Sequence, residues 1–208
     1  PGILVWNDSS REGTAVERDF ETVMVEQCAP VLAGLKPAGL FRYETRGCPD
    51  LARRVKGWND QLNPKGLRVR VLKGCVRTQR YLVYVYRESK LAAVLEDESV
   101  QRFLRQEGYC IPENGVPETG NLLTQLSRRL CCSAEFPHEI GVFLGYPLKD
   151  VVGFIENRGQ NFTCCGCWKA YGDPAAARKH FAQLSKCTAV YLRLFHSGTP
   201  ILRLAVAA

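Results

Sequence analysis

The feature that most constrains how this chain can fold is a run of three cysteines in four residues, within the stretch 163–171 that reads Thr-Cys-Cys-Gly-Cys-Trp-Lys-Ala-Tyr. Successive side chains of a β-strand point to opposite faces, so Cys164 and Cys165 cannot both face one core from a strand. On an irregular loop, with Gly166 relieving the backbone, all three sulfur atoms can converge on one point. Ionised thiols are metal ligands and nucleophiles. The run therefore predicts a functional site on a loop.

Composition sets the class of protein in which this site lies. A chain of 208 residues, 46% hydrophobic and 24% charged, is typical of one globular domain with a proper core. No apolar run approaches the roughly 20 residues of a membrane helix. The first 18 residues lack a basic start followed by an apolar stretch, so we expect a cytoplasmic protein. In a reducing compartment, ten cysteines favour metal binding, redox chemistry or burial over disulfides.

The net charge of +7 raises the question of a nucleic-acid partner. The basic residues are scattered over segments 53–56, 68–73 and 128–129, and no run of five or more is present. No helix-turn-helix, zinc-finger or RNA-recognition signature accompanies them. We therefore expect a solvated basic surface and no nucleic-acid partner.

In the first half of the chain, apolar periodicity predicts helices and a hairpin. A helical stripe covers residues 16–35, with a break or kink expected at Pro30. A short strand follows at 40–43. Cys48-Pro49-Asp50 begins a second helix, whose stripe continues through Leu62. A turn at 63–66 then leads into alternating segments at 67–72 and 81–86, which predict an antiparallel hairpin.

The second half is predicted to be mostly helical, with a second hairpin at the end. Helices are expected between residues 89 and 132, and a loop at 110–120 separates the last of them from the others. This last helix ends at Cys131-Cys132, where we expect one thiol to be buried and the other exposed. A short helix stopped by Gly145 and another opened by Pro147 precede the cysteine run. Asp173 is expected to cap a helix reaching about Lys186, before a closing hairpin of strands 187–195 and 201–206. The predicted fold is α+β, a small antiparallel sheet built from hairpins and packed with about seven helices.

Several segments together resemble an uncharacterised protein family of anaerobic bacteria, a domain of unknown function. The resemblance is carried by Phe-Pro-His-Glu-Ile-Gly at 136–141 with Gly-Tyr-Pro at 145–147, by Cys-Cys-Gly-Cys-Trp-Lys at 164–169, and by shorter matches at 28–37, 58–66, 84–87 and 186–187. It covers about residues 18–208, so residues 1–18 are interpreted as an extension outside the family pattern and 19–208 as a single domain. The resemblance implies life in low oxygen, which suits a thiol-rich or iron–sulfur site, and implies no particular activity.

The first hypothesis for the site is a metal centre. Cys164, Cys165 and Cys167 supply up to three thiolates, and Cys187, expected at the start of the next strand, supplies a fourth from a separate element. The paired C-x₂-C spacing of structural zinc sites is absent. Zn²⁺ and an iron–sulfur cluster are both candidate cofactors, and the three histidines, among them His138, are alternative ligands.

The second hypothesis is thiol-based redox or nucleophilic catalysis. Cys165 or Cys167, near a helix N-terminus and Lys169, would have a stabilised thiolate, and a neighbouring cysteine would resolve the oxidised form. His138 and Glu139 would be the acid–base partner if the fold brings them close. Trp168, Lys169 and Tyr171 would form the wall of a cofactor or ligand site. A redox partner protein or a small molecule would be the substrate.

The third hypothesis is a binding or partner module in which the cysteines are only packed. The phosphate-binding patterns G-x-x-x-x-G-K-[ST] and G-x-G-x-x-G are missing, and so is the nucleophile elbow G-x-S-x-G. The sequence leaves the three hypotheses open.

Overall fold

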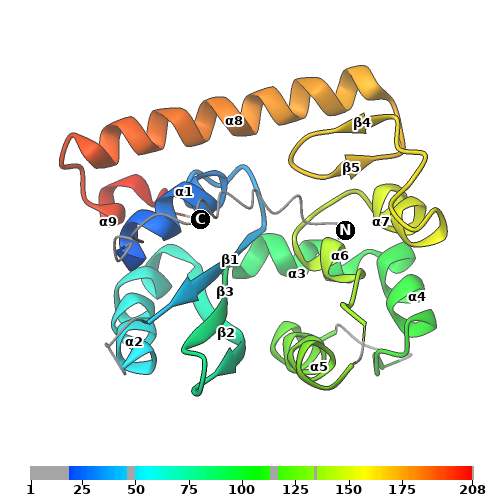
Figure 1. Ribbon diagram of the computed structural model, residues 1–208, viewed down its shortest axis with the longest axis horizontal. Helices are drawn as coiled ribbons and strands as arrows, with labels where there is room; N and C mark the ends of the chain where they lie inside the picture. The colour runs from blue at the N-terminus through cyan, green and yellow to red at the C-terminus, as the bar shows by residue number, and fades with distance from the viewer. Residues whose placement is uncertain (1–18, 46–49, 113–116, 134, 208) are drawn as a thin grey trace.

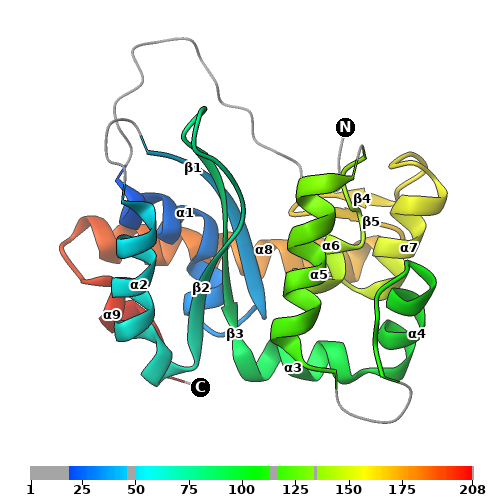
Figure 2. The ribbon, with the colours of Figure 1, turned by 90° about the horizontal axis from the view of Figure 1, so that it is seen from below.

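A three-stranded antiparallel sheet of order β1-β3-β2 is the centre of the fold (Figures 1 and 2). The structure is a computed structural model and describes residues 19–45, 50–112, 117–133 and 135–207. The strands are β1 (Ala38–Glu44), β2 (Leu67–Cys75), β3 (Arg80–Arg87), β4 (Cys164–Cys165) and β5 (Lys169–Ala170). The helices are α1 (Phe20–Leu32), α2 (Leu51–Leu62), the short 3₁₀ helix η1 (Asn63–Lys65), α3 (Glu88–Glu96), α4 (Glu98–Gln106), α5 (Thr119–Cys132), α6 (Ile140–Phe143), α7 (Leu148–Glu156), α8 (Pro174–His196) and α9 (Ile201–Leu204).

The sheet divides the apolar interior into two clusters because its side chains alternate between faces. Leu40 and Tyr84 lie opposite each other in register and belong to one cluster, whereas their neighbours Phe41 and Val83 belong to the other. A bulge between Val71 and Lys73 shifts the register of β2. Both faces of the sheet are therefore covered, and the sheet lies inside the molecule.

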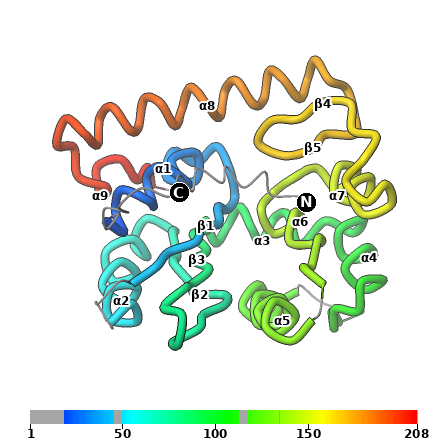
Figure 3. The backbone as a smooth tube through the Cα atoms, viewed as in Figure 1, coloured from blue at the N-terminus to red at the C-terminus, as the bar shows by residue number. Residues whose placement is uncertain are grey.

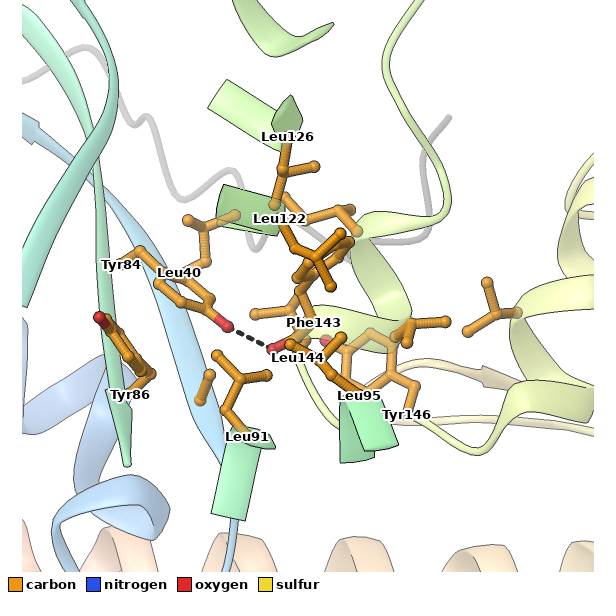
Figure 4. Packing of buried hydrophobic residues seen from close by; sticks show 14 of the residues in the cluster. Leu40, Tyr84, Tyr86, Leu91, Leu95, Leu122, Leu126, Phe143, Leu144 and Tyr146 are labelled. Atoms are coloured by element: carbon orange, nitrogen blue, oxygen red, sulfur yellow. Dashed lines mark hydrogen bonds between the residues drawn. The ribbon is translucent and has the colours of Figure 1, made fainter. Parts of the chain in front are cut away.

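Different helices cover the two faces, as Figure 2 shows. Helices α1, α2 and α9 pack on one face, and α3 to α7 form the larger cluster on the other. In that cluster the Tyr84 hydroxyl donates a hydrogen bond to the Phe143 carbonyl, among Leu91, Leu122 and their neighbours (Figure 4). Helix α8 runs along the molecule from the β4–β5 hairpin to α1 and α9 (Figure 3). It joins the two sides of the sheet.

Much of the predicted pattern is confirmed. The fold is α+β, and seven helices of seven or more residues lie within the described part of the chain. The hairpin of β2 and β3 is antiparallel, as the alternation predicted. Asp173 caps α8 through the N–H of Ala175, as predicted. The second helix begins at Leu51, later than predicted, and Asp50 is its N-cap, accepting a hydrogen bond from the Arg53 backbone N–H.

Four expectations are wrong. The predicted closing hairpin is a pair of helices, because residues 187–195 continue α8 and residues 201–204 form α9. The apolar residues of this segment recur at helical spacing. Gly198, with a φ of 92°, follows the end of the long helix. Cys131 and Cys132 are both exposed. Helix α1 passes through Pro30 without a break and ends two residues later. The cysteine run lies on a small β-hairpin, not on an irregular loop.

Some features of the sequence cannot be compared with the fold. Cys48, Pro49 and the extension 1–18 lie outside the described residues. Among the residues that are described, no helix combines the length and the apolar character that crossing a membrane requires.

Candidate functional site

The cysteine run forms a tight hairpin with a three-residue turn. Cys164 pairs with Ala170 and Cys165 with Lys169, so Gly166, Cys167 and Trp168 form the turn. The Gly166 N–H donates to the Trp168 carbonyl at 3.0 Å. A Cβ atom on Gly166 would lie 2.2 Å from the Phe181 ring, so only glycine lets the turn pack this closely on α8.

A buried carboxylate attaches this hairpin to α7. Asp150, which is 4% exposed, accepts a hydrogen bond from Trp168 Nε1 at 2.8 Å and another from the Tyr171 backbone N–H at 2.8 Å. On the same hairpin, Lys169 Nζ donates to the Gly159 carbonyl at 2.8 Å. The polar groups of Trp168 and Lys169, and the backbone of Tyr171, are thus used to hold the hairpin in place.

The four predicted metal ligands do not form a coordination site. Cys164 packs against the larger apolar cluster, whereas Cys165, its neighbour on the strand, is exposed. Cys187 is half-buried on α8, in a helix and not at the start of a strand. Within the described part of the chain no three His, Cys, Asp or Glu residues are grouped to hold a metal ion, and all nine cysteines there are free thiols. Within the described residues these thiols are therefore not grouped as the ligands of a Zn²⁺ ion or an iron–sulfur cluster would be.

The turn of the hairpin instead forms one wall of a pocket of about 460 Å³, here called the Lys36 pocket. Its other walls come from α1, the segment between α1 and β1, β1 itself, the segment after α6, and α8. The polar lining residues are Gln27, Lys36, Tyr146, Cys167, Ser185 and Thr188. The remaining lining residues are apolar or glycine, among them Leu40, Leu144 and Leu184. Such a size and lining are usual for a small-molecule site.

The end of α1 places Lys36 in this wall. Gly34 adopts a φ of 75°, the left-handed conformation that ends many helices. The Pro30 carbonyl then accepts the backbone N–H of Leu35 at 2.8 Å and that of Lys36 at 3.0 Å. Arg87 fixes the same helix end, because its guanidinium donates to the carbonyls of Val31 and Leu32, each at 2.6 Å.

Lys36 is a half-buried cation without a compensating charge. Its Nζ lies 4.9 Å from the centre of the Tyr146 ring. Among the described residues it has neither a hydrogen bond nor an ion pair with a carboxylate. Burial lowers the pKa of the amine, and the nearby thiols of Cys167 and Cys28 oppose that shift only in part. The amine therefore holds its proton less tightly than an exposed lysine does.

The groups around Lys36 are kept in their neutral forms. Burial raises the pKa of the Cys167 thiol, although the charge of Lys36 acts in the opposite direction. Cys28, fully buried behind Gly39, has its pKa raised to about 12 by burial. Burial also raises the pKa of the Tyr146 phenol, whose ring stacks on Trp168 with 4.7 Å between centroids. Near neutral pH the thiols and the phenol keep their protons.

The predicted acid–base pair lies elsewhere. Glu139 is buried against α5, where it pairs with Arg129 at 3.3 Å and accepts a hydrogen bond from the Tyr109 hydroxyl at 3.1 Å. His138 packs its ring against Phe154, with 5.0 Å between centroids, and its buried Nδ1 has no hydrogen-bond partner among the described residues. Neither residue lines the Lys36 pocket. The fold therefore separates this pair from Cys167.

A comparison with models of protein families identifies the family of this chain. The model of a family described as "Protein of unknown function (DUF3793)" matches residues 24–205. The chain belongs to the DUF3793 family. Neither the curated proteins nor the solved structures contain a match to it. The sequence resemblance to a domain of unknown function is confirmed at this level, and the family description assigns no activity to the site.

Four residues of the candidate site of this DUF3793 protein were not singled out as site residues from its sequence: Lys36, Tyr146, Asp150 and Arg87. Lys36, Tyr146 and Arg87 do lie in segments that carry the family resemblance. Lys36 occurs in a Lys-Pro pair between a helix and a strand, where an exposed turn residue is the ordinary expectation. Asp150 occupies the first turn of α7, a position that usually signals helix capping alone. No spacing within the sequence links these residues to the cysteines, so only their packing identifies them.

Proposed function

We propose that this protein binds a small amphipathic anion, a carboxylic acid with an apolar body, in the Lys36 pocket. The observation that carries the proposal is the position of Lys36: a cation in the pocket wall, under the Tyr146 ring, with no carboxylate partner among the described residues. Removing an ammonium group from water is costly unless an opposite charge compensates it. A bound carboxylate would supply that charge.

The rest of the pocket suits the apolar part of such a ligand. Leu40, Leu144 and Leu184 supply apolar wall, and the Tyr146 ring offers a flat face. Ser185 and Gln27 add hydrogen-bond donors for the polar end. The volume of about 460 Å³ suits a molecule with one aromatic ring or a medium-length chain.

The test is a calorimetric comparison of 4-phenylbutanoate with the uncharged 4-phenylbutanamide. A hydrogen bond to a charged group contributes about 1.5–3 kcal/mol, so the acid should bind at least about tenfold more tightly than the amide. Lys36→Met should remove this preference, and Lys36→Arg should keep it. Equal affinity for acid and amide, or an unchanged preference in Lys36→Met, contradicts the proposal.

A second candidate function is thiol chemistry at Cys167, which is supported by its place in the same pocket wall as Lys36. A redox or nucleophilic role requires a thiolate. Timed alkylation with iodoacetamide at pH 8, followed by peptide mass spectrometry, compares Cys167 with Cys165, the other exposed cysteine of the hairpin. Faster alkylation of Cys167 would favour the thiol function; slower alkylation is expected if burial of its thiol dominates.

A further inference from the structure

The Lys36 pocket has two nucleophilic groups in its wall, the amine of Lys36 and the thiol of Cys167. Both residues line the same pocket, and the charge of each acts on the pKa of the other. A ligand held by its acid group near Lys36 would therefore be exposed to attack by nitrogen or by sulfur. The structure indicates which of the two is the reactive group.

Burial affects the two groups in opposite ways. It favours the neutral form of any ionisable group. The neutral form of an amine carries the free electron pair that attacks a carbonyl carbon, whereas the neutral form of a thiol is the unreactive one. The same surroundings therefore increase the reactive fraction of Lys36 and decrease that of Cys167.

The contacts of Lys36 leave its amine available to a ligand. Its recorded partner is the face of the Tyr146 ring at 4.9 Å, which offers no acceptor that would fix the direction of the N–H bonds. The backbone, in contrast, is held rigidly by the Pro30 carbonyl and by the left-handed turn at Gly34. A fixed backbone, with an amine at the pocket wall that has no hydrogen bond to any described residue, is the arrangement expected of a lysine that forms a covalent bond to its ligand.

We propose that Lys36 forms an imine with the carbonyl carbon of a 2-oxo acid bound in this pocket. The inference rests on the proposed binding of carboxylic acids and narrows their class. Nζ attacks the carbonyl carbon to give a carbinolamine, the C–O bond breaks, and the oxygen leaves as water with two protons from the nitrogen. One amine and one carbonyl thus give one imine and one water. The adjacent carboxylate would be bound by donors such as Gln27 and Ser185.

The experiment compares 2-oxo-4-phenylbutanoate with 4-phenylbutanoate, which differ only in the ketone. The protein is incubated with either acid and sodium cyanoborohydride, and adducts are located by peptide mass spectrometry. We expect the oxo acid to modify Lys36 at least about tenfold more than the exposed Lys56 in the same digest, because the pocket holds the ketone beside Lys36 and because burial lowers the pKa of its amine. The acid without the ketone should leave no adduct.

Lys36→Arg is the matched control, because it retains the positive charge but forms no stable imine. It should still bind 4-phenylbutanoate while losing the adduct at this position. If wild-type protein binds both acids but Lys36 is modified no more than Lys56, the imine proposal is wrong and acid binding stands. If neither acid binds, both proposals are overturned.

Discussion

Replacing Asp150 with alanine should destabilise the protein more than any exposed charge removal, because one buried carboxylate satisfies a buried indole N–H and a part-buried backbone N–H. Asp150 accepts from Trp168 Nε1 and from the Tyr171 backbone N–H, each at 2.8 Å. A buried donor left without a partner costs about 1–3 kcal/mol. Two such donors, with the lost attraction to the N-terminus of α7, give a loss of about 3–4 kcal/mol in the free energy of unfolding for Asp150→Ala.

Urea denaturation followed by tryptophan fluorescence measures this loss. With a denaturant slope of about 2 kcal/mol/M, the midpoint should fall by about 1.5–2 M. Asp150→Asn retains one acceptor oxygen and should lose about half as much. Asp173→Ala is the matched control: that carboxylate accepts one backbone N–H at 2.8 Å but is exposed, so its loss should cost about 1 kcal/mol.

A double-mutant cycle tests whether the loss arises from the bond to Trp168. Trp168→Phe removes the indole N–H while keeping an aromatic ring against Tyr146 and Phe181. In this background Asp150→Ala leaves only the part-buried Tyr171 N–H without its acceptor, so the double variant should be more stable than the sum of the single losses by about 1–2 kcal/mol. Strict additivity, or a loss for Asp150→Ala no larger than that for Asp173→Ala, would refute the assignment.

Two further predictions concern the Lys36 pocket itself. Lys36→Met should raise the free energy of unfolding at pH 7, because the lowered pKa of Lys36 means that the unfolded chain binds this proton more tightly than the folded protein does. The difference in this free energy between Lys36→Met and wild type should shrink as the pH rises toward about 10.4, the pKa of an unperturbed lysine. Urea titrations at several pH values measure it. Gly39→Ala should lower the free energy of unfolding by about 1–3 kcal/mol, since the added Cβ would lie 2.8 Å from Cys28 Sγ. Cys28→Ala should relieve that clash, so the double variant should lose less than the sum of the two single losses. Additive losses in thermal unfolding would contradict the assigned contact.

The parts of the fold that were predictable from sequence are those in which local pattern and tertiary packing agree. The stripe of α2 and the alternation of β2 and β3 each face a core, so periodicity alone locates them. The end of α8 shows the opposite case. Residues 187–195 contain Val190, Tyr191 and Phe195, which are residue types common in strands. The side chains on the helix face that includes Leu192, however, pack against α1. That tertiary contact, and not the local propensity, decides that the segment is helical.

The candidate site was predictable only in part, for a similar reason. The cysteine run lies in a segment that contributes to the pocket, because the turn that contains Cys167 lines it. Its chemistry could not be read from the spacing, since β4 sends Cys164 toward the core and leaves Cys165 exposed. The pocket also needs Lys36, which precedes Cys167 by more than a hundred residues. Periodicity predicts local structure and does not predict a contact between residues more than a hundred positions apart in the sequence.

The contrast among the charged groups inside the fold is the strongest argument for a role of Lys36. Arg87, Asp150 and Glu139 are each less than 5% exposed, and each has partners. Arg87 donates to three backbone carbonyls, and Asp150 accepts from two N–H groups. Glu139 pairs with an arginine and accepts a hydrogen bond from a phenol. These groups hold segments of the chain together. Among the described residues, the Lys36 amine has neither a hydrogen bond nor an ion pair. Within its described part, the fold satisfies these three buried charges and leaves the half-buried amine of Lys36 unpaired at a pocket wall. An energetic cost remains there, and such costs are concentrated at functional sites.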